Sequence, residues 1–408
     1  MAKSESLIYR TFVSLSYRDF RLVWLGSVTE HLGEWMEIVG LLWLVNELTG
    51  SPLMLTVVGS CRYIPMVIFP ILGGMVADTM DRRRLLIFAL LGAALLSIIL
   101  AILVKTGTVA IWHIIVLSLL SGVTTSLNHP ARQSIVPNLV TREHLLNAIS
   151  LDSASVQASR LVATPITGYL IARFGVVPVF GLRAAGTLLA VCWLLFVKIR
   201  FLPPVTTKAP WRNVIEGLKY VRGNILLLSM VPLYLLPMLT QNTYSNFLPI
   251  FARDILKIGP TGYGFLQGAP GLGALASLIG LASLASNRVQ GSLLFIASGI
   301  IGIGFIFFSV SHWTSFSLFL LVIIGGMITS FMTINTALIQ SHVSDVMRGR
   351  VMSLREIAFG LGPTGSLIFG VIAERSSVSF SLELLGSLCI AVSLSLFFLL
   401  PKVRITKV

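Results

Sequence analysis

Charged residues are scarce in this chain of 408 residues. Asp, Glu, Lys and Arg make up 11% of it, against about 25% in soluble globular proteins, whereas 55% of the residues are hydrophobic. The mean hydropathy is +0.90. The apolar residues fall in long runs, such as residues 85–104, and about 20 apolar residues suffice for a helix to cross a bilayer. This scarcity argues against a soluble enzyme and predicts a polytopic membrane protein.

Cysteines and catalytic motifs are also rare or missing. The three cysteines, Cys61, Cys192 and Cys389, lie inside apolar runs, without metal-ligand spacing, and their odd number does not indicate a disulfide framework. The sequence has no Gly-x-x-x-x-Gly-Lys-Ser/Thr, no His-Glu-x-x-His and no Gly-x-Ser-x-Gly. We therefore expect no ATP site of that kind, no metal, no cofactor and no enzymatic activity.

The net charge of +14 comes from basic residues that lie mostly in short loops between the apolar runs. If the N-terminus is cytoplasmic, 21 of the 30 Lys and Arg residues fall on the cytoplasmic side and five on the opposite side. This asymmetry follows the positive-inside rule and predicts an even number of spans with both termini in the cytoplasm. No basic helix is interleaved with aromatics, so we expect the lipid bilayer, and not a nucleic acid, as the surrounding partner.

Twelve apolar runs predict an all-α polytopic membrane protein with twelve transmembrane helices. The runs cover residues 20–46, 53–77, 84–105, 109–129, 145–172, 176–199, 225–251, 262–285, 291–310, 313–338, 350–373 and 378–400. We expect an N-terminal six-helix bundle (1–199), a cytoplasmic linker (200–224) and a C-terminal six-helix bundle (225–408). In the linker, Trp211, Val214, Leu218 and Val221 recur at helical spacing, which indicates an amphipathic helix that joins the two halves or lies on the membrane surface.

The two halves share a weak internal repeat. Asn128, Gln133, Ser134 and Val136 have counterparts 207 residues later, beginning at Asn335. Six helices per repeat preserve the orientation, so the repeats are parallel and related by an axis along the membrane normal. Such a duplication places a cavity between the two halves, as alternating access requires.

The loop after the second span carries a recognisable motif, Gly74-x-x-x-Asp78 followed by Asp81-Arg82-Arg83-Arg84. Gly74 permits the close approach of two helices. Asp78, at a helix end, can accept hydrogen bonds from the N-terminus of a neighbouring helix. A positive-inside signal explains the arginines, but it leaves the Gly-x-x-x-Asp spacing unexplained.

With this motif the sequence resembles the major facilitator superfamily. The stretches around Gly33-Glu34-Trp35, Pro130–Pro137 and Leu146-Asn147-Ala148 are similar to the subgroup that holds drug and macrolide exporters and enterobactin-type siderophore exporters. The resemblance implies two parallel six-helix repeats, proton-driven export and a bacterial cytoplasmic membrane. It also implies a conformational lock made of Gly74, Asp78, Asp81, Arg82 and Arg83, with Asp78 against the start of the eleventh span.

The sequence departs from the subgroup at three places. Thr79 replaces the usual basic residue after the aspartate, and the fourth span lacks the arginine of many proton-coupled drug exporters. The antiporter motif of the fifth span is reduced to Thr164-Pro165-x-x-Gly168. These departures leave proton antiport open.

Acidic residues inside the first span are the candidates for proton coupling. Glu30, Glu34 and Glu37 are spaced i, i+4 and i+7, on one helix face, and His31 adjoins them. Carboxylates that lie close together do not all ionise readily, so we expect at least one to hold a proton. By depth we favour Glu30 and Glu34, with His31 as a further proton site. The alternative is a structural ion pair of these acids with Arg62 or Arg160.

Candidates for substrate binding lie in several other spans. A charge in the bilayer is expensive and usually functional, so Arg62 and Arg160 are expected to pair with acids or to bind an anionic substrate. Amide and aromatic side chains of the seventh and tenth spans suit a moderately polar organic solute. The substrate-binding candidates are Arg62, Arg160, Tyr234, Gln241, Asn242, Tyr244 and Asn335. For the polar residues the alternative is ordinary hydrogen bonding between helices.

The sequence thus predicts a monomeric secondary transporter that exports a drug-like or siderophore-like small molecule by alternating access, with protons as coupling ion. A lipid or lysophospholipid flippase of the same fold is the alternative.

Overall fold

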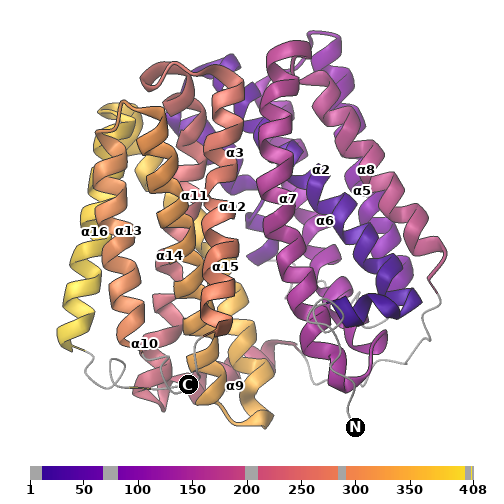
Figure 1. Cartoon of the computed structure of the whole chain (residues 1–408), viewed down its shortest axis with the longest axis vertical. Helices are drawn as coiled ribbons and strands as arrows, with labels where there is room; N and C mark the ends of the chain where they lie inside the picture. Colours follow the sequence, from indigo (N-terminus) through magenta and orange to yellow (C-terminus); the bar gives the residue numbers. More distant parts are fainter. Residues whose placement is uncertain (1–11, 68–80, 198–209, 284–290, 400–405, 407–408) are drawn as a thin grey trace.

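The structure, a computed structural model, describes residues 12–67, 81–197, 210–283, 291–399 and 406, and every regular element in these residues is a helix (Figure 1). The N-terminal helices are α2 (Arg18–Thr49), α3 (Pro52–Cys61), α5 (Arg82–Lys105), α6 (Ile111–Ile135), α7 (Leu145–Phe174) and α8 (Val177–Leu195). The helix α9 (Pro210–Arg222) follows. The C-terminal helices are α10 (Ile225–Leu233), α11 (Leu235–Ile250), α12 (Gly259–Ser283), α13 (Ser292–Ser309), α14 (Thr314–Ser341), α15 (Asp345–Arg375) and α16 (Val378–Leu399). Short 3-10 turns cover Val13–Ser16, Val136–Asn138 and Arg142–His144, and a π-helical turn, Phe251–Ile255, extends α11.

These helices confirm the predicted all-helical polytopic fold, because each predicted span overlaps at least one of them. Seven of the described helices are long and apolar enough to cross a membrane by length and composition alone. Two physical features distinguish some of the remaining helices. α2 and α15 carry several charged residues, and α10 and α11 divide one span at Tyr234, just after Pro232. Charged residues are tolerated in such helices when they face protein instead of lipid.

The helices gather into an N-terminal and a C-terminal group that stand side by side (Figure 1). In the N-terminal group, α2 packs against α7 and α8, and α5 packs against α6 and α8. In the C-terminal group, α14 packs against α12 and α13, and α13 packs against α16. The two groups meet chiefly along two helix pairs, α7 with α12 and α3 with α15, and α11 makes smaller contacts with α3 and α2.

Small residues allow α7 and α12 to approach closely. A Cβ atom on Gly264 would lie 3.0 Å from the Cα of Gly168 and would collide with the carbonyl oxygen of Thr164. The Thr164 hydroxyl donates a hydrogen bond of 2.9 Å to the carbonyl of Gly264. Glycine is therefore required at this crossing, where backbone touches backbone.

The pair α3 and α15 is joined by hydroxyl groups. Ser60 donates a hydrogen bond of 2.8 Å to the carbonyl of Pro363. Nearer the start of α3, the hydroxyl of Ser51 donates a bond of 2.7 Å to the carboxylate of Glu374. These contacts run from the last turn of α3, which faces the middle of α15, to the end of the molecule at which α2 ends and α3 begins. We call this end the closed end.

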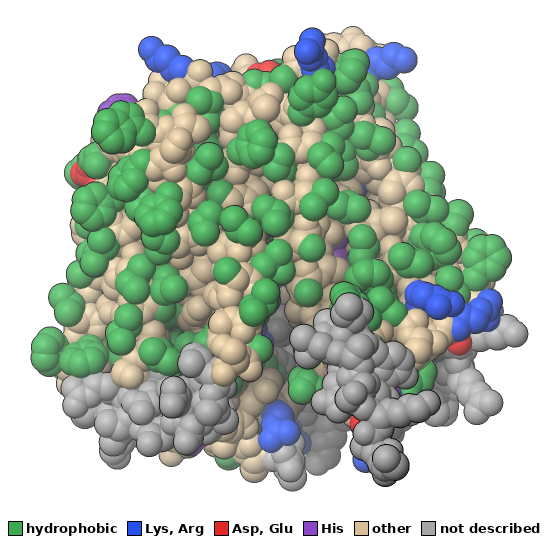
Figure 2. All heavy atoms as spheres, viewed as in Figure 1, with side chains coloured by type: hydrophobic (Ala, Val, Ile, Leu, Met, Phe, Trp, Pro, Cys, Tyr) green, Lys and Arg blue, Asp and Glu red, His purple; other side chains and the backbone are tan. Residues whose placement is uncertain are grey.

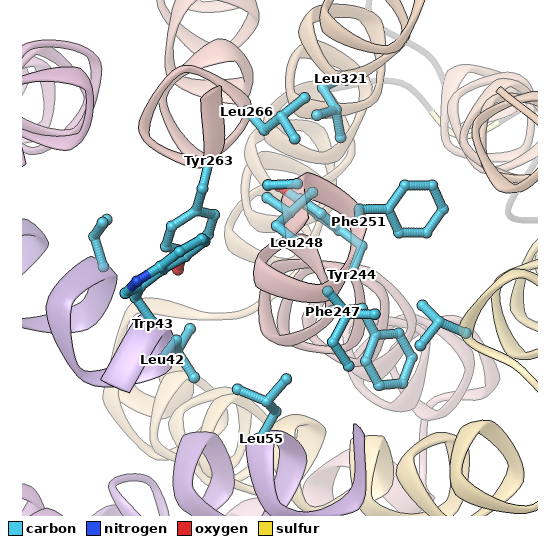
Figure 3. Packing of buried hydrophobic residues seen from close by; sticks show 14 of the residues in the cluster. Leu42, Trp43, Leu55, Tyr244, Phe247, Leu248, Phe251, Tyr263, Leu266 and Leu321 are labelled. Carbon is cyan, nitrogen blue, oxygen red and sulfur yellow. The ribbon is translucent and has the colours of Figure 1, made fainter. Parts of the chain in front are cut away.

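An aromatic cluster seals the closed end (Figure 3). Trp43 of α2 stacks on Tyr263 of α12, with 5.7 Å between ring centroids and 25° between ring planes. Leu55 and Phe247 lie in the same buried cluster, so both groups of helices contribute to it (Figure 3). Burial of this apolar surface stabilises the contact between the groups in this conformation.

The outer surface is apolar, as a bilayer requires. Hydrophobic side chains cover the middle of the face in Figure 2, and Lys and Arg lie toward its ends. Trp112 and Trp313, at the starts of α6 and α14, are 60% and 78% exposed. Exposed tryptophans at helix ends are typical of the boundary between lipid and water.

The helix α9 lies in the segment expected to link the two halves, and it packs against α15. Glu216 and Arg350 form an ion pair of 2.7 Å between the two helices. A Cβ atom on Gly217 would lie 2.8 Å from the carbonyl oxygen of Arg350. Val221 is buried and Leu218 is exposed.

Candidate functional site

Three acidic residues of α2 face the interior of the N-terminal group, and each meets a different arginine. Glu30 is buried and accepts a hydrogen bond of 2.7 Å from the amide of Asn128 on α6. Arg132, one turn further along α6, donates to the other oxygen of the Glu30 carboxylate at 3.3 Å. Glu30 and Arg132 line a small pocket whose other walls include Leu86 and Leu90.

Glu37 pairs with Arg183 of α8. The Nε of Arg183 lies 2.9 Å from the Glu37 carboxylate, and its Nη1 donates to the backbone carbonyl of Glu30 at 3.0 Å. The Arg183 side chain is 3% exposed and that of Glu37 is 11% exposed. A Cβ on Gly33 would lie 3.0 Å from Cδ of Arg183, so this glycine makes room for the arginine. The pair fastens α2 to α8 within one group of helices.

Glu34 differs from the other two acids in its exposure and its neighbours. It lies 16 residues into the 32-residue helix α2, about 24 Å from its start. Its carboxylate forms an ion pair with Arg62, which follows α3, and lies 3.6 Å from Nδ1 of His31. The Glu34 side chain is 25% exposed, whereas that of His31 is 5% exposed. Among the described residues, Nε2 of His31 is buried without a hydrogen-bond partner.

Of the two arginines that could pair with acids of the first span, one does so. Arg62 forms an ion pair with Glu34. Arg160 instead bonds to neutral groups. Its Nε donates to the carbonyl of Gln267 on α12 at 2.9 Å, and its Nη2 lies 3.3 Å from the hydroxyl of Tyr244 on α11. The guanidinium also lies over the ring of Trp35, 4.7 Å from its centroid.

The remaining substrate candidates occupy different environments. Tyr234 is buried and accepts a hydrogen bond of 2.8 Å from Arg355, whose guanidinium lies over its ring. Gln241 and Asn242 are half-buried, and Asn242 donates to the carbonyl of Met238 in its own helix at 3.0 Å.

Asn335 is fully buried in α14. Its amide donates a hydrogen bond of 3.1 Å to the carbonyl of Met230 on α10. Asn128, its counterpart in the repeat, likewise bonds to a facing helix, through Glu30. This placement favours a role for Asn335 in holding two helices together.

The residues of the predicted lock are described only in part. Gly74 and Asp78 lie outside the described residues, as does the side chain of Arg82. Asp81 caps the N-terminus of α5, where its carboxylate accepts a bond of 2.8 Å from the backbone N–H of Arg83. Arg83 donates to the carbonyls of Leu194 and Leu195 at the end of α8, at 3.1 Å and 2.7 Å. Both side chains thus bond within the N-terminal group.

Sequence reasoning missed two partners of the acidic stripe. Arg132 was expected in a cytoplasmic segment, but α6 continues to Ile135, so Arg132 lies in the helix and is buried. The i, i+4 spacing of Asn128 and Arg132 is the signal that places both side chains on one helix face. Arg183 lies 146 residues after Glu37, and no local sequence signal connects the two.

Comparisons with known proteins identify the family. The transmembrane secretion effector family of the major facilitator superfamily matches residues 9–407. The chain belongs to this family. It is a transporter of the major facilitator type and a multi-pass membrane protein.

Curated relatives of this transporter cover nearly its whole length. It is 24% identical over 380 residues to the staphyloferrin A transporter of Staphylococcus aureus, covering 92% of this chain and 94% of the relative. It is 22% identical over 388 residues to macrolide efflux protein A of Streptococcus pyogenes, with the same two coverages. It is 25% identical over 362 residues to an enterobactin exporter of Shigella boydii, covering 84% and 83%.

Solved structures agree on the fold. The nucleoside transporter NupG superposes with a TM-score of 0.75 at 12% identity, covering 93% of this transporter and 99% of NupG. A peptide transporter of the POT family superposes with a TM-score of 0.76 at 14% identity, covering 95% and 96%. At such identities the likeness concerns the fold alone.

Proposed function

We propose that this transporter exports a small organic molecule from the cytoplasm, driven by protons that flow inward across a bacterial cytoplasmic membrane. Two relatives support the direction, because they are named for efflux of macrolides and export of enterobactin. These two and the staphyloferrin A transporter support the substrate range. The basic loops, which follow the positive-inside rule, support a cytoplasmic location of both termini.

Alternating access follows from the way the two groups of helices meet. The proposed moving bodies are residues 1–199 and 225–408, joined by the linker 200–224. Their contacts along α7–α12 and α3–α15 combine close backbone packing with a few hydroxyl bonds. In our proposal these contacts break and re-form as the central site opens first to one side of the membrane and then to the other.

The proposed proton site is the cluster of Glu34, His31 and Arg62. The observation that carries the proposal is the position of Glu34, which is the most exposed of the three paired acids and lies halfway along α2. A proton on the Glu34 carboxylate would abolish its charge and release Arg62. His31 completes this cluster, because its Nδ1 lies 3.6 Å from the Glu34 carboxylate and its Nε2 is buried without a hydrogen-bond partner among the described residues.

Glu30 is a second candidate proton site in this proposal. Its carboxylate accepts hydrogen bonds from both Asn128 and Arg132. Glu30 and Arg132 also line a small pocket. Glu37 is left out because its ion pair with Arg183, at 2.9 Å, is shorter than the 3.3 Å between Glu30 and Arg132, and Arg183 is held in place by a second bond to the carbonyl of Glu30.

The test is transport in everted membrane vesicles that contain the protein. Staphyloferrin A, erythromycin and enterobactin are supplied outside, with and without a proton gradient, and control vesicles lack the protein. We expect accumulation of at least one compound, and its loss when a protonophore dissipates the gradient. Gradient-independent movement of a fluorescent lysophospholipid, with no accumulation of the three compounds, would overturn the proposal in favour of a flippase.

A further inference from the structure

Arg160 stands apart from the other arginines of the N-terminal interior. Arg62, Arg132 and Arg183 each pair with one of the three acids of α2. Arg160 is 4% exposed, and no carboxylate of the described part of the chain lies within ion-pair distance of it. Its contacts are a backbone carbonyl, a tyrosine hydroxyl and an indole ring. Within the described residues, Arg160 is therefore a buried positive charge without a carboxylate partner.

Such a charge is expensive to keep in a membrane protein. Burial removes the hydration of the guanidinium, and neutral acceptors replace it less well than an anion does. Intramembrane charges that persist without a counterion usually lie on a substrate or ion pathway. A guanidinium also presents two parallel N–H groups, which match the two oxygens of a carboxylate.

We propose that the transported molecule carries a carboxylate and that Arg160 binds it. This inference rests on the proposed function, since it names the chemical class of the substrate. One uncompensated positive charge matches the single negative charge of a carboxylate, whereas a phosphate dianion would leave one negative charge in excess.

The neutral partners of Arg160 connect this binding to the movement of the halves. Gln267 and Tyr244 belong to the C-terminal group, whereas Arg160 and Trp35 belong to the N-terminal group. In the present conformation the arginine therefore joins the two groups. A carboxylate that binds Arg160 replaces these two bonds and weakens the contact between α7 and α12. The substrate thereby promotes the opening that releases it.

The experiment measures ligand binding in detergent, without any gradient. Benzoate, butyrate and hexanoate, which each carry one negative charge, are each compared with the corresponding amide, with inorganic phosphate as a further probe. The readouts are the thermal unfolding temperature and tryptophan fluorescence, to which Trp35 contributes beside Arg160. We expect at least one carboxylate to stabilise the wild type and change its fluorescence, and the amides and phosphate to do neither.

Variants locate the effect at Arg160. Arg160→Gln is expected to abolish the carboxylate response, and Arg160→Lys to retain part of it. Arg253→Gln is the matched control, because Arg253 also donates across the groups, to the carbonyl of Asn46, but has Asp254 as its ion partner. Tyr244→Phe removes one competing bond and should tighten carboxylate binding about two- to tenfold.

The proposal fails if carboxylates and amides act alike on the wild type, or if phosphate acts best. It also fails if folded Arg160→Gln keeps the full response, or if folded Tyr244→Phe binds carboxylates no more tightly. If Arg160→Gln does not fold, the comparison of wild type, Arg160→Lys and Tyr244→Phe still decides. Carboxylate binding without transport of any compound would refute the proposed function alone.

Discussion

The crossing of α7 and α12 offers the sharpest test of the conformational model. In the substitution Gly264→Ala, the added Cβ would lie 3.0 Å from the Cα of Gly168 and closer to the carbonyl oxygen of Thr164. Both neighbours are backbone atoms, so a rotamer change cannot relieve the clash. Overpacking of this kind costs about 1–3 kcal/mol, which corresponds to a shift of about 5- to 150-fold in an equilibrium. The cost falls only on conformations in which the two helices touch.

We therefore expect Gly264→Ala to favour conformations in which the two groups of helices separate at the end of the molecule where α2 ends and α3 begins. The assay is the distance distribution between spin labels at Leu48 and Phe380, which are 45% and 50% exposed near that end, in a background without native cysteines. The matched control is Gly280→Ala in the same helix, because a Cβ there meets nothing within 4 Å. An unchanged distribution in Gly264→Ala, or an equal shift in both variants, would refute the reasoning.

Three further predictions concern stability. Glu37→Gln leaves the buried Arg183 without its acid and should lower the free energy of unfolding by about 3 kcal/mol; thermal unfolding in detergent measures this, and an unchanged midpoint contradicts it. Asp81→Ala removes the N-cap of α5 and should lower the free energy of unfolding by about 1 kcal/mol. A loss of transport at unchanged stability would instead indicate that Asp81 belongs to the conformational lock. Asn335→Ala should lower stability by about 1–3 kcal/mol and leave the range of transported compounds unchanged; an altered range would restore Asn335 to the substrate site.

The helices were predictable because hydrophobic length and flanking charge determine where a chain crosses a bilayer. The predicted run 378–400 and the helix Val378–Leu399 nearly coincide. Helix ends that project beyond the apolar region were less predictable. α6 extends past residue 129 to Ile135, since Pro130 lies inside the helix without ending it. This extension carries Arg132 to Glu30.

The acidic face of α2 was visible in the sequence, because its spacing is a local property of a helix. The partner of each acid was not predictable, because Arg62, Arg132 and Arg183 come from other parts of the chain and only tertiary packing selects among them. The contacts of Arg160 were the least predictable from the sequence. Its partners are a backbone carbonyl and the hydroxyl of Tyr244, and no sequence pattern predicts a bond to a backbone atom of a distant helix.

We propose that protonation of the Glu34 cluster couples proton influx to transport. The most direct measurement is Glu34→Gln in everted vesicles, with the compound that the wild type accumulates. Glu47→Gln, at an exposed position of the same helix, is the control. The account predicts that accumulation by Glu34→Gln no longer responds to the proton gradient, while Glu47→Gln behaves like the wild type. Full gradient-driven accumulation by Glu34→Gln would contradict it.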